Sequence, residues 1–182
     1  MTLQKIGGCS LVATLVAFAA PLTAQQPAAD LEALREEAVK KATRQVGPSV
    51  VQIQTSGGTD VVASGPRGAQ VRKGMGPTTG LILTPDGYII SSAFNFANKP
   101  SSIDVAVPGH SSRYIAKVIA TDTTRMLTLL KIEAQGLPVP TATPKSGFRI
   151  GQTALALGRT LEPDHNKSPT VSEGIISAVE RI

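Results

Sequence analysis

The sequence predicts an all-β protein with a short N-terminal helix, in which one closed β-barrel is complete and a second barrel has only begun. About six short segments rich in β-branched residues precede a proline-rich linker at residues 136–147, and about two follow it. The 182 residues are 41% hydrophobic and include 17 Gly and 13 Pro, which supplies a core and many turns. The first barrel would occupy residues 49–135, and residues 136–182 would hold the linker and the start of the second barrel.

Residues 1–24 have the three-part pattern of a secretory signal peptide. A positively charged start precedes an apolar run at residues 11–20, and small residues end at Ala24, after which cleavage is expected. An uncleaved membrane anchor is the alternative, although the strongly apolar part is short for a span. The single cysteine, Cys9, lies in this segment, so the mature chain would have no disulfide. The pattern predicts export to a bacterial periplasm or cell envelope, with no stable membrane span after cleavage.

An N-terminal helical segment is expected at residues 25–48. Asp30 can cap this helix, and Leu31 and Leu34 begin an apolar face that is surrounded by charged residues. The glycine and proline at residues 47 and 48 end the helix.

The strands are expected where β-branched runs are bounded by turn residues. Residues 84–87 and 108–110 have the composition of tight turns and would each close a hairpin. A glycine-rich stretch, 55–77, is expected to be a long loop. The predicted strands are residues 49–54, 79–83, 88–92, 103–107, 114–120 and 127–132, followed after the linker by 153–157 and 170–179.

Charge and composition predict neither nucleic-acid binding nor a cofactor. The formal net charge is +5, but the densest basic patch, Arg67 with Arg72 and Lys73, has no interleaved aromatic residues on which bases could stack. The two histidines, His110 and His165, lie far apart in sequence and have no Glu-x-x-His companion, so we expect no metal site.

Residues 79–90, Thr-Gly-Leu-Ile-Leu-Thr-Pro-Asp-Gly-Tyr-Ile-Ile, resemble the segment before the catalytic histidine in the HtrA/Deg (periplasmic Do-like) branch of trypsin-like serine proteases. Neighbouring segments agree in order. Residues 38–54 are similar to the family's helix and first strand, 121–132 to the strand with the catalytic aspartate, and 151–158 and 171–178 to the opening strands of its second barrel. The resemblance implies a trypsin-like double β-barrel.

The same resemblance implies that the catalytic positions have lost their chemistry. The family's histidine would fall at Phe94, whose ring exchanges no proton, and its aspartate at Met126, whose thioether carries no charge. The family's serine would lie beyond Ile182. We therefore expect no catalytic residue in this chain and a truncated second barrel.

No other residue is expected to take over these roles. His110 and His165 are predicted to be solvated loop histidines. Ser56 belongs to a Ser-Gly-Gly sequence, but it follows the first strand, which is the wrong place in the fold. Asp122 lies near the aspartate position, where a register slip could recruit it, but it would have no histidine to orient.

Two functional classes remain. The first is an exported, noncatalytic HtrA-like pseudoprotease that binds unfolded polypeptide or an envelope protein through the remaining cleft, for example by strand addition. The second is a fragment or decayed product of a periplasmic serine endopeptidase of protein quality control. Core packing is expected for both Phe94 and Phe96, and the alternative is that one of them lines the cleft. Self-association is expected through the incomplete second barrel.

Overall fold

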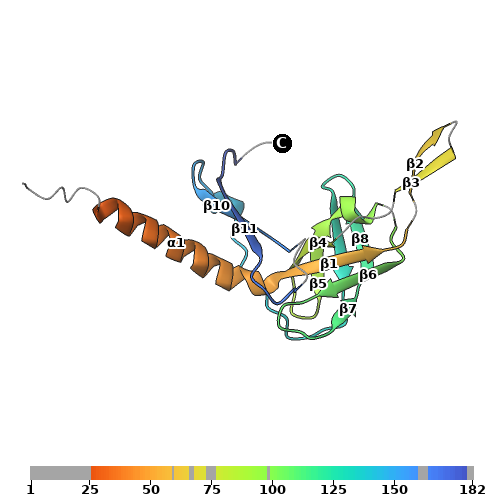
Figure 1. Ribbon diagram of the computed structural model, residues 1–182, viewed down its shortest axis with the longest axis horizontal. Helices are drawn as coiled ribbons and strands as arrows, with labels where there is room; N and C mark the ends of the chain where they lie inside the picture. Colours follow the sequence, from red (N-terminus) through yellow and green to blue (C-terminus); the bar gives the residue numbers. More distant parts are fainter. Residues whose placement is uncertain are drawn as a thin grey trace, which may run out of the picture. The chain divides into compact units, whose positions relative to one another are not determined.

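The computed structural model describes residues 26–58, 60–65, 68–72, 77–97, 99–159 and 164–179 (Figure 1). The predicted signal peptide, residues 1–24, lies outside the described residues, as do Arg67 and Lys73 of the basic patch. The chain divides into two units between residues 35 and 36, and all the strands among the described residues belong to the second unit.

The N-terminal helix, α1 (Gln26–Val46), lies within the predicted helical segment. It begins four residues before Asp30, so the prediction that Asp30 caps it is wrong. The residues before Asp30 include a proline and two alanines, which suit the first turn of a helix. The predicted end is confirmed, because Gly47 begins a short 3₁₀ helix, η2 (Gly47–Ser49), that contains Pro48.

A single antiparallel sheet forms the main body of the fold. Its order is β7-β6-β1-β4-β5-β9-β8. β7 and β8 stand at opposite ends of this order although only Ala116 separates them in sequence, so one segment joins the two edges and curls the sheet into a barrel. The strands are β1 (Val50–Ser56), β4 (Pro77–Ile82), β5 (Tyr88–Ser92), β6 (Ser102–Ala106), β7 (Arg113–Ile115), β8 (Lys117–Asp122) and β9 (Leu127–Lys131). The prediction of an all-β barrel after a short helix is confirmed.

Two predicted elements differ from the structure. The expected strand at 114–120 is divided into β7 and β8, because its first part pairs with β6 and its second part with β9. The expected loop at 55–77 contains a hairpin of β2 (Asp60–Gly65) and β3 (Gly68–Arg72). The many glycines of this segment favour a loop, but the β-branched valines at 61, 62 and 71 favour strands, and this preference outweighs that of the glycines.

The predicted turn at residues 84–87 is confirmed in detail. The amide of Gly87 donates to the carbonyl of Thr84 at 3.1 Å, and the amide of Leu83 donates to the carbonyl of Tyr88 at 2.8 Å. Gly87 has φ of +103°, and a Cβ there would lie 2.4 Å from the carbonyl oxygen of Ile132. Only glycine fits this position without strain.

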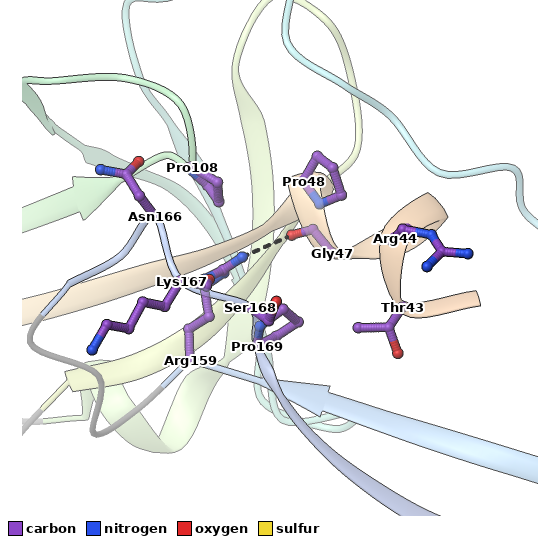
Figure 2. Close-up of a pocket in the computed structure, with 10 residues that line it drawn as sticks. All are labelled: Thr43, Arg44, Gly47, Pro48, Pro108, Arg159, Asn166, Lys167, Ser168 and Pro169. Carbon is purple, nitrogen blue, oxygen red and sulfur yellow. Dashed lines mark hydrogen bonds between the residues drawn. The ribbon is translucent and has the colours of Figure 1, made fainter. Parts of the chain in front are cut away.

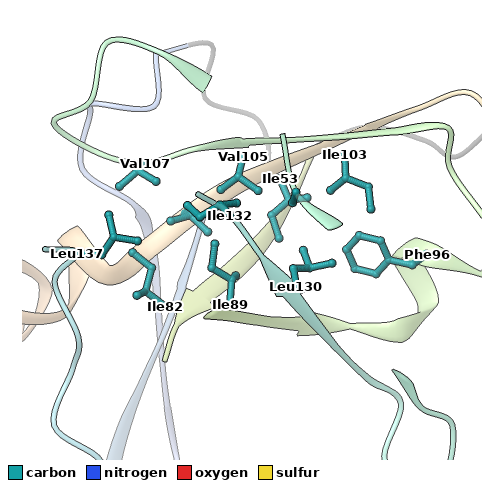
Figure 3. Packing of buried hydrophobic residues seen from close by; sticks show 12 residues of the cluster. Ile53, Ile82, Ile89, Phe96, Ile103, Val105, Val107, Leu130, Ile132 and Leu137 are labelled. Atoms are coloured by element: carbon teal, nitrogen blue, oxygen red, sulfur yellow. The ribbon is translucent and has the colours of Figure 1, made fainter. Parts of the chain in front are cut away.

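Branched aliphatic side chains fill the barrel (Figure 3). Each fully buried side chain of this kind contributes about 1.5–3 kcal/mol relative to exposure. Phe96 adds an aromatic ring at one end of the cluster and is 7% exposed. The cluster contains Val51, Ile53, Ile82, Ile89, Phe96, Ile103, Val105, Val107, Ala116, Leu130, Ile132 and Leu137.

After the linker, β10 (Thr153–Gly158) and β11 (Thr170–Ile175) form an antiparallel hairpin. The two strands expected here are therefore present and paired. β11 ends at Ile175, before the predicted end at residue 179. Most side chains of this hairpin are exposed or half-buried.

Candidate functional site

A short 3₁₀ helix, η3 (Ala93–Phe96), brings together the two segments that the resemblance singles out. The amide of Ala93 donates a 2.8 Å hydrogen bond to the carbonyl of Met126. Next to this bond, Ser92 at the end of β5 pairs with Leu127 at the start of β9. Phe94 and Met126 therefore lie on neighbouring segments at one end of the barrel.

Phe94 and Phe96 face different environments. Phe96 is buried in the core, whereas Phe94 is 66% exposed. The expectation of core packing is confirmed for Phe96 and wrong for Phe94, since residues two apart on a 3₁₀ helix do not share a face. Between them, the Nδ2 of Asn95 donates a 2.7 Å hydrogen bond to the Oγ1 of Thr78, which fixes η3 against β4.

Met126 adopts a backbone conformation that is unusual for its residue type. Its φ of +56° lies in the left-handed region, and its side chain is 48% exposed. Leu127, the next residue, is 37% exposed. We call Phe94, Met126 and Leu127 the apolar patch. Neither the hydrocarbon ring nor the thioether of this patch can accept or donate a proton in general acid–base catalysis.

Asp122 is occupied by a structural contact. Its carboxylate accepts hydrogen bonds from the amide of Arg125 at 2.9 Å and from the guanidinium of Arg125 at 2.8 Å. These bonds, the backbone one first and the side-chain one second, hold the pKa of Asp122 below its ordinary value. The carboxylate closes the turn that leads to Met126.

The two histidines, which are far apart in sequence, lie close together in the structure. The Nε2 of His165 donates a 2.9 Å hydrogen bond to the carbonyl of His110, and the Nδ1 of His110 lies 2.7 Å from the hydroxyl of Tyr114. Both histidines lie in loops, as predicted, and both are half-buried rather than fully exposed. The amide of Gly109 also donates to the Oδ1 of Asn166 at 2.9 Å, so two loops far apart in sequence dock on each other.

Arg159 is a buried residue that the sequence did not single out. It is 2% exposed, and its Nε donates to the carbonyl of Val50 at 2.7 Å. Its Nη2 donates to the carbonyl of Gly47 at 3.3 Å, the bond drawn in Figure 2. Its Nη1 donates to the carbonyls of His165 and Lys167. No sequence pattern marks Arg159 as a buried donor, because its acceptors are backbone carbonyls, which every residue carries.

A cavity of about 200 Å³ lies beside Arg159 (Figure 2). Arg44 and Lys167 extend from opposite sides of it, and their charged ends point away from each other. Because the charged ends of Arg44 and Lys167 do not converge on one point, these two residues do not form an anion-binding site in the cavity.

Within the described ranges, no group of three or more His, Cys, Asp or Glu could hold a metal ion. In the same part of the chain, no helix combines the length and the apolar character that crossing a bilayer requires.

Comparison with known proteins agrees with this architecture. Residues 78–181 match the family model of the trypsin-like peptidase domain. The chain is 30% identical over 178 residues to the putative serine protease HhoB of Synechocystis sp.. This match covers 90% of the present chain and 41% of HhoB. It is 34% identical over 116 residues to a probable periplasmic serine endoprotease DegP-like of Pseudomonas fluorescens, covering 64% of this chain and 23% of that one.

A solved structure of the HtrA-type protease AlgW with a tripeptide superposes with a TM-score of 0.57 at 25% identity. The match covers 75% of this chain and 38% of that one. An antiparallel barrel followed by a hairpin in a separate sheet is consistent with the double-barrel architecture of the trypsin-like class. The chain belongs to the trypsin-like peptidase family, in its HtrA/Deg branch. It spans less than half the length of each of these relatives.

Proposed function

We propose that this chain is a noncatalytic member of the family, a pseudoprotease, that binds extended segments of unfolded polypeptide at the apolar patch of Phe94, Met126 and Leu127. The observation that carries the proposal is the exposure of Phe94 and Met126 on two segments joined by the Ala93–Met126 hydrogen bond. Exposed apolar side chains that gather on one surface are typical of interaction sites.

The side chains at this site argue against peptide hydrolysis. Serine proteolysis needs a base that takes the nucleophile's proton and a carboxylate that orients that base. The resemblance places Phe94 and Met126 at those positions, and neither side chain can act in either role. Asp122 is held by Arg125, while His110 and His165 make hydrogen bonds within the docked loops.

Two comparisons favour polypeptide as the ligand and the periplasm as the location. The AlgW structure contains a tripeptide, and the Pseudomonas fluorescens relative is named a periplasmic endoprotease. A fold that positions a polypeptide for cleavage can retain binding without the catalytic groups. In the cell, the signal-peptide pattern of residues 1–24 would export the chain to the periplasm or envelope.

The experiment measures binding and cleavage of the same ligand. Fluorescently labelled casein, which is largely unfolded, is titrated with the purified chain and followed by anisotropy and by gel. We expect binding without cleavage. Phe94→Ser should weaken binding by about tenfold, since it removes most of one exposed aromatic surface.

Phe148→Ser is the matched control, because Phe148 is a 40% exposed phenylalanine outside the apolar patch, and it should leave the affinity unchanged. Cleavage of casein above a mock purification would overturn the noncatalytic assignment. Absence of casein binding by the unchanged chain would overturn the binding role. That second result would favour the alternative that the chain is a fragment or decayed product of a periplasmic serine endopeptidase.

A further inference from the structure

β8 is an edge strand with an exposed surface. Five of its residues are exposed and the sixth, Asp122, is half-buried. Val118 is 47% exposed and Ile119 is 52% exposed. β-branched side chains favour strands, and they stabilise a sheet most when side chains of a neighbouring strand pack against them.

The free edge of β8 results from the way the barrel closes. The segment pairs with β6 as far as the hydrogen bond from the amide of Ala116 to the carbonyl of Ile103, at 2.8 Å. Beyond that bond the chain passes the start of β6 at Ser102, and in the sheet order of the described strands β8 has only β9 beside it. Its outer backbone groups are therefore available to another strand.

A bulge places the two charged ends of β8 on one face. Lys117 pairs with Lys131 and Asp122 with Leu127, and the extra residue between Val118 and Ala120 shifts the register. Lys131 and Leu127 are four residues apart in β9 and share a face, so their partners Lys117 and Asp122 share it too. Without the bulge, two strand residues five apart would point to opposite faces.

We propose that β8 pairs antiparallel with β8 of a second copy of this chain about a twofold axis. In this register Ala120 lies opposite Ala120 of the second copy, Val118 lies opposite Thr121 of that copy, and Lys117 lies opposite its Asp122. Each of the two symmetric ion pairs joins residues on the same face, as directly opposed strand residues require. Asp122 keeps its two bonds from Arg125, and the remaining lone pairs of its carboxylate accept the ammonium of the second copy's Lys117.

Charge complementarity selects this register and this occupant. A slip by two residues separates both ion pairs, whereas a peptide of unrelated sequence would bring neither the carboxylate nor the ammonium to the required ends. Lys117 pairs with Lys131 within its own sheet, but the Nζ of Lys131 donates to the carbonyls of Asp86 and Ile132, each at 2.7 Å, so Lys131 does not compete with Lys117 for the second copy's carboxylate. This inference is independent of the proposed peptide binding.

The test is sedimentation velocity of the purified full chain over a range of concentrations. We expect a monomer–dimer equilibrium. Lys117→Glu and Asp122→Lys should each weaken it by at least about tenfold, because each substitution turns both ion pairs into like-charge pairs. An equimolar mixture of the two variants should recover the affinity as a heterodimer, since both of its cross-strand pairs then have opposite charges.

Ile119→Lys changes the same strand but leaves the Asp122–Arg125 contact intact. It therefore tests the dimer interface even if Asp122→Lys does not fold. It should also weaken dimerisation. Ile175→Lys, at a residue of β11 that is 65% exposed, is the control and should leave the dimer intact. A monomeric unchanged chain, or a dimer that Lys117→Glu and Ile119→Lys leave intact, would refute the proposal. Loss of the dimer in Ile175→Lys alone would instead place the contact on the second hairpin and would equally refute it.

Discussion

The carbonyl of Met126 accepts a 2.8 Å hydrogen bond from the amide of Ala93, and Met126 holds this position with a left-handed backbone, φ +56°. The contact joins the turn before β9 to the start of η3. The placement of the apolar patch therefore depends on a backbone conformation that its own central residue does not favour.

The first prediction concerns this conformation. Met126→Val should lower the free energy of unfolding by about 1–2 kcal/mol, because a β-branched residue is strongly disfavoured at positive φ. Met126→Asn should not lower it, since asparagine tolerates the left-handed region. Urea denaturation measures both variants. Leu127→Val, in a strand where valine is favoured, is the neighbouring control, and an equal loss in both valine variants would contradict the backbone explanation.

A second prediction separates steric overlap from backbone strain at two turn glycines. Gly87→Ala should lower the free energy of unfolding by about 3 kcal/mol, because the new methyl group would overlap the carbonyl of Ile132 as well as adopt positive φ. Gly109→Ala, with φ of +83° and nothing within 4 Å, should cost only the strain, about 1 kcal/mol. Thermal unfolding of the two variants gives the difference, and equal losses would show that the overlap is relieved.

The turn at residues 84–87 was predictable from the sequence, whereas several features of the candidate site were not. The Thr-Pro-Asp-Gly turn and the strand pairs around it were predictable because they depend on neighbouring residues. The exposure of Phe94 depends on η3 taking up a 3₁₀ conformation, and the approach of His165 to His110 depends on two loops that meet only in the folded chain. Arg159 was missed because its partners are backbone carbonyls, which no sequence pattern marks.

The third prediction tests Arg159. Arg159→Ala should lower the free energy of unfolding by about 2–4 kcal/mol, since it leaves buried carbonyls at Val50 and Gly47 without this donor. Arg159→Lys should recover only part of the loss, because one ammonium group cannot reproduce the planar fork. Denaturant unfolding measures both. Arg149→Ala, at an exposed arginine, is the control, and an Arg159→Ala variant as stable as that control would refute this role.

The fourth prediction concerns pH. The pKa of Asp122 is below its ordinary value because the ionised carboxylate accepts bonds from Arg125. The turn's contribution to stability is therefore present above the ordinary value and is lost as the pH falls through the lowered pKa. An NMR titration of the carboxyl carbon should show the lowered value.

Arg125→Ala should raise the pKa of Asp122 only partly, because the backbone amide, the larger cause, remains. A full return to the ordinary value in Arg125→Ala would show that the guanidinium dominates instead.

The bonds from Arg159 to Val50 and Gly47 also predict an order of events during folding. They connect residues separated by 109 and 112 positions, so they form only after most of the chain is available. The main sheet ends at β9 and can assemble earlier, from closer partners. Contacts that form after the rate-limiting step slow unfolding and leave the folding rate nearly unchanged. We therefore expect the Arg159 bonds to slow unfolding and so to lengthen the lifetime of the folded barrel.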